Sequence, residues 1–499
     1  MEIAPSQATT FPAFAERQRA LVRALREFLP AASVLYATEE TRPYECDGLT
    51  AYRQVPMCVA LPDTEEQVRR VLIACRELDA PVVARGAGTS LSGGAMPHAA
   101  GVLLSLAKFN HILRLDPLAR VAVVQPGVRN LAISEAAAPH GLYYAPDPSS
   151  QIACTIGGNV GENAGGVHCL KYGLTVHNVM RLRALTIDGD VIELGSEALD
   201  APGYDLAALM VGSEGMLAVV TEITVKLLPL PETARVILAS FDDVEKAGNA
   251  VAAIIAAGII PAGLEMMDQP ATHAVEEFVR AGYDLEAKAL LLCECDGMPE
   301  EVEDEIARTV EVLTRAGCTD LRVSRDEHER NKFWAGRKAA FPAVGRLSPD
   351  YYCMDGTIPR RKLGEVLRFI GAMEQKYGLR CPNVFHAGDG NLHPLILFDA
   401  ADPDQLRRTE AFADEVLRKC VEVGGTITGE HGVGVEKIDT MCVQFTPGER
   451  DAFFAVKRAF DPPGLLNPGK AIPTLVRCAE YGKRHMRHGQ APFPDIPRF

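Results

Sequence analysis

The sequence contains no hydrophobic run long enough to cross a lipid bilayer. Its longest apolar stretch, Val251–Leu264, has 14 residues and is interrupted by two glycines and a proline, whereas a spanning helix needs about 20 residues. The N-terminus also lacks the hydrophobic segment and small-residue cleavage site of a secretory signal. We therefore expect no transmembrane helix and a cytoplasmic location.

Paired cysteine motifs are missing as well. The 13 cysteines include no CxxC, and the nearest pair is Cys293 and Cys295. A disulfide framework or a cysteine-held zinc or iron–sulfur cluster would show regular spacing. The sequence instead predicts buried thiols.

Cationic residues are outnumbered by anionic ones. Lys and Arg total 51 against 66 Asp and Glu, which gives a formal net charge of −15. Nucleic-acid affinity comes largely from cations that neutralise phosphates, so no nucleic-acid partner is expected. Hydrophobic residues make up 47% of the 499 positions, which indicates a folded protein of two or three domains.

Helical and strand-like patterns alternate along the chain and predict an α+β fold. An amphipathic helix is expected at Phe14–Leu29, and a second one after a cap at Asp63. From about residue 56 to residue 230, short β-rich runs are joined by glycine-rich turns, with a hairpin at Asp188 and Gly189.

A proline-containing segment, Leu227–Glu232, predicts the point where the chain leaves its first domain. Beyond it, helix-like and strand-like segments alternate as in a second α+β domain. Near the C-terminus, the basic stretch Arg477–Arg487 predicts a solvated face.

Three glycine-rich loops predict a site for a large anionic ligand. They are residues 85–94 (RGAGTSLSGG), 155–166 (TIGGNVGENAGG) and 211–215 (VGSEG), with a rigid turn, PDPSS, at 146–150. Small residues let backbone amides approach an anion closely enough to donate to it. The first loop is not the dinucleotide-binding GxGxxG, because Leu91 stands where the third glycine belongs. Together the loops favour an extended ligand over separate tight turns.

Two further segments combine histidine with glycine. HAGDGNLH at 386–393 places two histidines seven residues apart, which excludes the i, i+4 spacing of a helical metal site. A turn at Gly388–Gly390 can bring both rings to one centre. Glu430 and His431 lie in a similar segment, TGEHGVG. Two imidazoles and a carboxylate suit a catalytic divalent cation, although hydrogen-bonded turns are an alternative.

The glycine-rich loops resemble the FAD-binding half of the vanillyl-alcohol-oxidase-type flavoprotein superfamily. The resemblance covers about residues 50–230 and rests on RGAGTSLSGG, the PDPSS and TIGGNVGENAGG run, and GSEGMLAVVTEITVKL. It implies a two-part FAD-binding domain in which the first loop holds the pyrophosphate. Thr89 stands where relatives with covalent flavin often place histidine, so a non-covalent FAD is expected. The implied cofactor contacts are Arg85, Gly86, Ala87, Gly88, Thr89, Ser90, Pro146, Ser150, Gly157, Gly158, Gly161, Asn163, Ala164, Gly215, Ile223 and, from a C-terminal segment that returns to the flavin, Asn467.

HAGDGNLH and GEHGVG resemble the paired motifs of the FAD-linked oxidase C-terminal domain, found in D-lactate, D-2-hydroxyglutarate and glycolate dehydrogenases. The resemblance implies that His386, His393 and Glu430 hold a divalent metal, which would be zinc, manganese or iron. It also implies that His431 is the base beside the flavin.

Oxidation of a 2-hydroxy acid requires a group that binds the substrate carboxylate as well as a base. Arg337, in FWAGRKAAFP, is the candidate, because a guanidinium matches a carboxylate with two parallel hydrogen bonds. A surface cation is the alternative interpretation of this residue.

These inferences combine into a four-part organisation. We expect an N-terminal helical segment at residues 1–49 and an FAD-binding domain at 50–230. A substrate and metal-binding α+β cap domain would follow at 231–430, and a segment at 431–499 would return to the flavin.

The expected reaction is oxidation of a small 2-hydroxy acid by hydride transfer to flavin. Residues 350–362 (DYYCMDGTIPRRK) resemble glycolate-oxidising members of the family, and Phe341 and Cys353 stand where relatives acting on dicarboxylates carry polar side chains. Glycolate is therefore expected first and D-lactate second. The resemblance also implies two partner subunits, one flavin-type and one iron–sulfur, which would pass electrons to quinone and associate the chain peripherally with the inner membrane.

Three alternatives compete with this prediction. The chain could be a D-lactate or D-2-hydroxyglutarate dehydrogenase that acts alone. It could be a metal-dependent hydrolase whose glycine-rich loops are merely structural. It could also be a flavin-binding assembly subunit without turnover, which the presence of His431 and Arg337 argues against.

Overall fold

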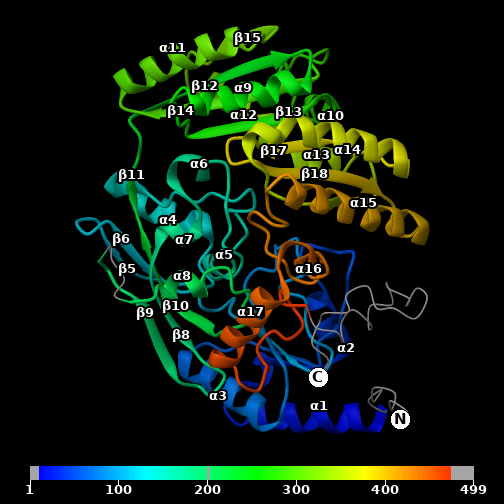
Figure 1. The fold of residues 1–499 in the computed structure, drawn as a ribbon. Coiled ribbons are helices and arrows are strands. Elements are labelled where there is room, and N and C mark those ends of the chain that lie inside the picture. Colours follow the sequence, from blue (N-terminus) through cyan, green and yellow to red (C-terminus); the bar gives the residue numbers. More distant parts are fainter. Residues whose placement is uncertain (1–10, 199–202, 474–499) are drawn as a thin grey trace.

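The computed structural model describes residues 11–198 and 203–473. The basic stretch Arg477–Arg487 therefore lies outside the described residues. The fold is a mixed α+β architecture with an upper and a lower half, as Figure 1 shows. No helix within the described ranges is both long and apolar enough to cross a membrane. Nine of the twelve described cysteines are buried, as expected for thiols in a core.

The lower half contains two main sheets. The first has the strand order β1-β2-β4-β3 and the second the order β5-β6-β10-β8-β9. The strands are β1 (Val34–Leu35), β2 (Cys58–Ala60), β3 (Val82–Arg85), β4 (Val102–Ser105), β5 (Ile112–Asp116), β6 (Val121–Val124), β8 (Val179–Leu185), β9 (Val191–Gly195) and β10 (Val219–Lys226), and a small pair joins β7 (Leu142–Tyr143) to β11 (Leu228–Pro229).

Short helices connect and cover these sheets. They are α1 (Phe11–Arg26), α2 (Thr38–Thr41), α3 (Glu65–Glu77), α4 (Asn130–Ala137), α5 (Ile156–Glu162), α6 (Cys169–Tyr172), α7 (Thr175–Asn178) and α8 (Leu206–Met210). The predicted hairpin joins β8 to β9, and Gly189 in its turn has φ +79°, a conformation that favours glycine.

The predicted cap of α3 is wrong by one residue. Thr64 is the N-cap, and its side chain accepts the backbone N–H of Gln67. Asp63 instead donates its own backbone N–H to the side chain of Gln67 at 2.6 Å. Both residues suit a cap, so composition alone did not distinguish them.

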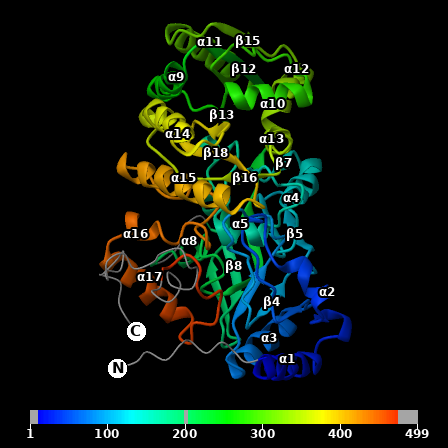
Figure 2. The same cartoon turned by 90° about the vertical axis from the view of Figure 1, so that its right-hand side faces the viewer.

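The upper half is built on one antiparallel seven-stranded sheet with the order β15-β12-β14-β13-β17-β18-β16. Figure 2 shows helices α9, α14 and α15 on one side of this sheet and α10, α12 and α13 on the other. The strands are β12 (Thr233–Phe241), β13 (Gly263–Asp268), β14 (Ala289–Gly297), β15 (Asp320–Val323), β16 (Asp350–Cys353), β17 (Asn383–His386) and β18 (Asn391–Phe398). The helices are α9 (Val244–Ala256), α10 (Gln269–Val279), α11 (Pro299–Arg315), α12 (Glu327–Lys338), α13 (Ala340–Val344), α14 (Leu363–Tyr377) and α15 (Pro403–Glu422).

Alternating side chains of the central strands bury both faces of this sheet. In β12, Ile237 and Ala239 belong to the core beneath α9 and α14, whereas Val236 and Leu238 belong to the core beneath α10 and α12. Two covered faces explain the continuous apolar runs of β12 and β14. A polar side chain buried on such a strand needs a specific partner.

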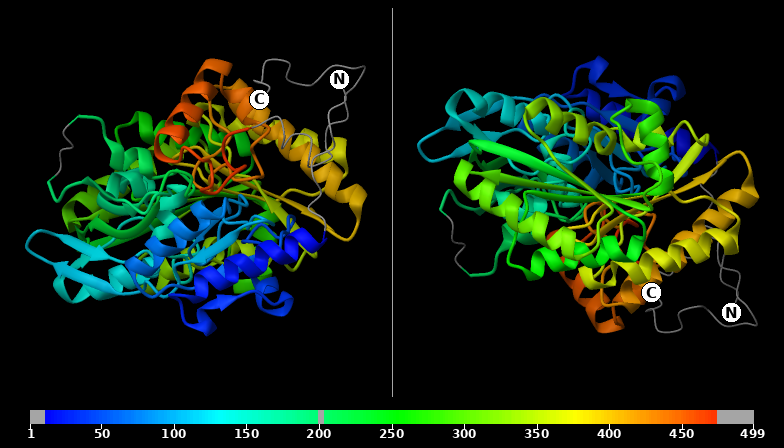
Figure 3. Two further views of the ribbon diagram at one scale, coloured as in Figure 1. Left: turned by 90° about the horizontal axis from the view of Figure 1, so that it is seen from below. Right: turned by 90° about the horizontal axis from the view of Figure 1, so that it is seen from above.

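The chain returns to the lower half after α15. Helices α16 (Met441–Gln444) and α17 (Pro447–Phe460) follow, orange to red in Figure 3. Val456 and Phe460 of α17 pack against the core beneath the second sheet of the lower half. Lys457 Nζ donates to the carbonyl oxygens of Met216 and Leu466, both at 2.6 Å. Asn467 N–H donates to the carbonyl of Val82 in β3 at 2.7 Å. The C-terminal part of the chain is thus joined to the sheet that precedes the first glycine-rich loop.

Candidate active site

A cavity of about 380 Å³ lies where the two halves meet, within the usual size range of ligand sites. All three glycine-rich loops and the PDPSS turn contribute to its wall, and so do His393, Glu430 and His431. Residues from distant parts of the sequence therefore converge on one space.

Most of the predicted cofactor residues line this cavity. The twelve that do are Arg85, Gly86, Ala87, Gly88, Thr89, Ser90, Ser150, Gly157, Gly158, Gly161, Ala164 and Gly215. A Cβ added to Gly161 would meet no described atom within 4 Å, so a side chain at this position of the wall would project into open space. Thr155, also in the wall, has a buried hydroxyl with no hydrogen-bond partner among the described residues. A glycine-lined wall with an unsatisfied hydroxyl fits an extended polar cofactor.

Four predicted contacts do not line the cavity. The Pro146 carbonyl accepts from Asn130. Asn163 is the C-cap of α5, with φ 55°, and its side chain accepts the backbone N–H of Val176. Ile223 is fully buried in the core of the lower half.

Asn467, the fourth of these residues, forms hydrogen bonds with the first and the third glycine-rich loops. Its Nδ2 donates to the carbonyl oxygens of Gly94 and Glu214, at 2.9 and 2.6 Å. In this structure Asn467 therefore shapes the cavity wall from behind, as Asn163 and Pro146 do.

The predicted turn brings two histidines together. His386 ends β17, and His393 in β18 lies opposite Val384, so both rings project from the same face of the hairpin. Gly390 in the turn has φ +76°, and a Cβ there would collide with the carbonyl of Ile358. The rings lie edge to face with centroids 4.9 Å apart.

Glu430 completes the predicted three-residue set. Its Oε1 lies 3.2 Å from His386 Nε2 and 3.3 Å from His393 Nε2. Candidate ligand atoms of the three side chains all lie within 4.8 Å of one another. The His431 ring stacks on His393 at 4.9 Å, and its Nε2 lies 4.0 Å from Glu430 Oε1.

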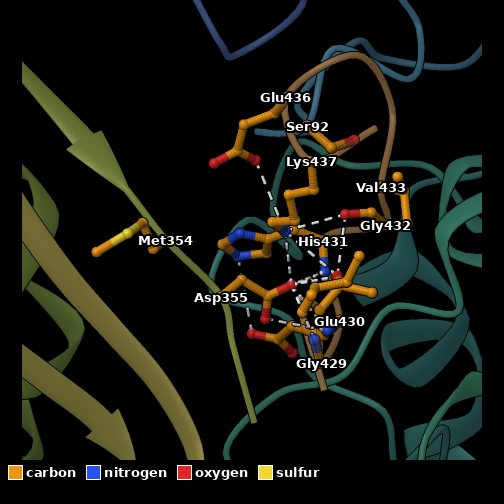
Figure 4. A network of polar contacts seen from close by, with 12 residues as sticks. Ser92, Met354, Asp355, Gly429, Glu430, His431, Gly432, Val433, Glu436 and Lys437 are labelled. Atoms are coloured by element: carbon orange, nitrogen blue, oxygen red, sulfur yellow. Dashed lines mark hydrogen bonds and ion pairs between the residues drawn. The ribbon is translucent and has the colours of Figure 1, made fainter. Parts of the chain in front are cut away.

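Asp355 holds the loop that carries Glu430 and His431, as Figure 4 shows. Its carboxylate accepts the backbone N–H groups of Gly429, Glu430 and His431 at 2.9–3.1 Å. Lys437 Nζ lies 3.1 Å away, and both side chains are fully buried. Burial raises the pKa of Asp355, but Lys437 and the nearby histidines outweigh it, so that the pKa lies well below its usual range.

The histidines differ in charge preference. Burial lowers the pKa of His386, but Glu265 and Glu430 outweigh it and raise the value to about 10. Burial lowers the pKa of His431 to about 4, with His393 and Lys437 acting in the same direction and Asp355 opposing it. The cluster thus favours positive charge at His386 and a neutral ring at His431.

Arg337 is buried, so its interpretation as a surface cation is wrong. Only 3% of its side chain is exposed, and its Nε donates to Glu265 Oε2 at 2.7 Å. Its Nη2 is buried without a hydrogen-bond partner in the described part of the chain. Arg337 does not line the cavity, although Lys338, the last residue of the same helix, and Phe341 in α13 do.

Sequence reasoning missed Glu265 and Asp355. Glu265 Oε1 lies 2.8 Å from His386 Nδ1 while its other oxygen accepts from Arg337, so one carboxylate orients both side chains. The available signal was an acid within the apolar strand-like run GLEMM. Asp355 had no comparable signal, because its partners follow more than 70 residues later.

Comparisons with known proteins now identify the family. Residues 56–195 match the FAD-binding domain family, and residues 230–471 match the C-terminal domain of FAD-linked oxidases. The glycolate oxidase subunit GlcD of Escherichia coli (strain K12) is 62% identical over 479 residues, which cover 96% of each chain. The chain belongs to the FAD-linked oxidase family. The predicted FAD-binding and oxidase C-terminal domains are thereby confirmed, and the FAD-binding match contradicts the interpretation of the glycine-rich loops as merely structural.

Other relatives extend the comparison. The GlcD subunit of Bacillus subtilis (strain 168) is 40% identical, covering 87% of this chain and 93% of that protein. A D-lactate dehydrogenase of Anaerostipes hadrus is 32% identical, covering 90% and 96%. Among solved structures, p-cresol methylhydroxylase with substrate bound has a TM-score of 0.80 at 18% identity, covering 92% of this chain and 98% of that one. This last likeness shows the fold alone and confirms the predicted fold class.

Replacement of Gly161 by leucine should fill the cavity without straining the backbone. Gly161 is helical and its added side chain would occupy open space, so we expect a folded protein that no longer binds FAD. Gly371→Leu is the matched control, because it also lies within a helix, α14, and an added Cβ there meets nothing within 4 Å. Flavin content measures FAD binding in both variants, and circular dichroism measures whether they are folded. A Gly161→Leu protein that keeps its full FAD content would show that the cofactor does not occupy this cavity.

Proposed function

We propose that the chain oxidises glycolate to glyoxylate in an FAD-dependent reaction, with D-lactate as a second substrate. One observation carries this proposal: His393, Glu430 and His431 line the same cavity as the three glycine-rich loops. A base and a cation-binding cluster would therefore face a substrate held against the flavin. The names of the GlcD relatives support glycolate, and the name of the Anaerostipes hadrus relative supports D-lactate.

The donor set supports a divalent cation at His386, His393 and Glu430. Two imidazoles and a carboxylate leave coordination positions open for substrate. Metal-binding histidines commonly donate their other ring N–H to a carboxylate that orients the ring. Glu265, beside His386 Nδ1, is placed to be that carboxylate. The raised pKa of His386 reflects a cluster that stabilises positive charge. A bound zinc, manganese or iron ion would polarise the substrate hydroxyl.

His431 is the proposed base. Its ring is neutral at pH 7 because burial lowers its pKa to about 4, and Nε2 is the ring nitrogen that the structure brings to 4.0 Å from Glu430. We infer that Nε2 removes the proton of the substrate hydroxyl. Bound flavin supplies the chemistry of a hydride acceptor.

Arg337 is the proposed group that binds the substrate carboxylate. Glu265 fixes one edge of its guanidinium through Nε, and the buried Nη2 is left to donate elsewhere. Phe341, in the cavity wall with its ring 6.5 Å from that of His393, would limit the size of the substrate. Cys353 is buried and does not line the cavity, so of these two residues only Phe341 is placed to exclude a second carboxylate.

The GlcD relatives are each named as a subunit, which supports partner subunits for this chain as well. We propose that a flavin-type subunit and an iron–sulfur subunit receive the electrons and pass them to quinone, with the complex peripherally associated with the cytoplasmic side of the inner membrane.

The substrate is tested by anaerobic addition of glycolate, D-lactate and D-2-hydroxyglutarate to the FAD-loaded protein. Bleaching of the oxidised flavin should be fastest with glycolate, slower with D-lactate and slowest with the dicarboxylate. Preferential bleaching by D-2-hydroxyglutarate would contradict the assignment, and absence of bleaching with all three would contradict 2-hydroxy acid oxidation itself.

His431→Asn should slow flavin reduction by about 10² to 10⁴, the usual contribution of a general base, while FAD is retained. Because the wild-type ring is neutral above its pKa of about 4, the reduction rate should be level from pH 8 to pH 6 and fall only as the pH approaches 4. Stopped-flow absorbance measures both effects.

His273→Asn, on the exposed side of α10, is the matched control for a histidine distant from the cavity. Metal content is measured on each sample. A His431→Asn variant that keeps its metal and reduces flavin at the wild-type rate would show that the base is another residue.

A further inference from the structure

Two buried carboxyl groups that the proposed chemistry does not use lie in the wall of the FAD cavity. Glu162 ends α5, and Glu214 lies in the third glycine-rich loop. A Cβ built on Gly94 would collide with Glu162 Oε1 and come within 3.3 Å of Glu214 Oε2. A Cβ on Gly432 would likewise collide with Glu162 and come within 3.1 Å of Glu214. The two carboxyl groups are therefore near neighbours.

The hydrogen bonds of the two groups are unequal. Glu214 uses both oxygens, since Oε1 accepts the backbone N–H of Val433 at 2.7 Å and Oε2 accepts that of Gly434 at 2.8 Å. Backbone donors of this kind favour the ionised form of a carboxyl group. Burial raises the pKa of Glu214, but these two N–H groups, Lys470 and Lys437 all act in the opposite direction. Glu214 is thus placed to carry the negative charge of the pair.

Glu162 has much weaker support for a charge. Its Oε1 accepts from the hydroxyl of Ser90 at 3.0 Å, and its Oε2 is buried without a partner among the residues that the structure describes. Burial raises the pKa of Glu162 well above its usual value, and the charge of Glu214 raises it further, with a smaller contribution from Asp47. Two like charges at this distance and burial cannot both be ionised without a large cost.

We propose that Glu162 is a neutral carboxylic acid that donates a hydrogen bond to bound FAD and limits this part of the cavity wall to the single negative charge of Glu214. The charge state of Glu162 affects how readily the bound flavin is reduced. Reduced flavin is commonly an anion at neutral pH, so a second carboxylate in the wall would oppose reduction further, whereas a neutral acid would not. Glu162 is then a positioning residue for the cofactor. The inference rests on the FAD of the proposed function but not on its substrate.

The test uses a neutral replacement that can still donate. Glu162→Gln should bind FAD within about threefold of wild type and leave the midpoint potential of the flavin unchanged at pH 7, because an amide resembles a protonated acid in charge and shape. Glu162→Ala should bind FAD about tenfold more weakly, as expected for one lost hydrogen bond. Asp47→Asn is the matched control, because its carboxyl group is also buried in this cluster but does not line the cavity.

Infrared spectroscopy identifies the protonated group directly. The reduced-minus-oxidised difference spectrum of the FAD-loaded protein, with dithionite as reductant, should contain the carbonyl stretch of a protonated carboxylic acid. This band should disappear in Glu162→Gln and persist in Asp47→Asn. Because no substrate is used, failure here is distinct from failure of the glycolate assignment.

Three results would overturn the proposal. The first is a midpoint potential that rises in Glu162→Gln, as it would if a negative charge had been removed. The second is loss of FAD from that variant, and the third is a carboxylic acid band that Glu162→Gln leaves unchanged.

Discussion

The position of the loop at residues 429–434 depends on buried carboxylates that accept its backbone N–H groups. Asp355 binds residues 429–431 from the side of the upper sheet, and Glu214 binds Val433 and Gly434 from the side of the glycine-rich loops. The loop that carries Glu430 and His431 is thus held from both halves. Lys437 compensates the charge of Asp355, and without it a buried carboxylate would be costly. This double attachment sets the position of the proposed base and of the proposed cation ligand Glu430 relative to the cavity.

A second constraint links the upper sheet to the same loop. Glu265 lies between apolar residues of β13 and binds both His386 and Arg337. His386 in turn reaches Glu430. A single buried acid therefore orients a proposed metal ligand and the proposed carboxylate-binding group, which need a fixed separation if one small substrate is to contact both.

The sequence predicted the parts of the site that are local and failed for those that join distant segments. Glycine-rich loops and the HAGDGNLH turn are short, so their composition indicated both a cofactor cavity and two histidines on one face. Asp355 and Glu265 act through partners far along the chain, and a single sequence contains no sign of such pairings. Arg337 was ambiguous for the same reason, since only tertiary packing shows that it is buried.

Asn467 was predicted as a flavin contact through resemblance, but in the structure it supports the loops through hydrogen bonds and does not line the cavity. The four-part division of the chain stays a prediction.

The central claim is that a divalent cation at His386, His393 and Glu430 acts with His431 on a 2-hydroxy acid facing FAD. Its most direct test is anaerobic flavin reduction by glycolate, and by glycolate deuterated at C2, before and after chelation, with metal and FAD content measured on each sample. We expect bleaching that deuterium slows, that chelation abolishes while FAD is retained, and that added zinc, manganese or iron(II) restores. Bleaching of the metal-free, FAD-loaded protein at the undiminished rate would contradict the account.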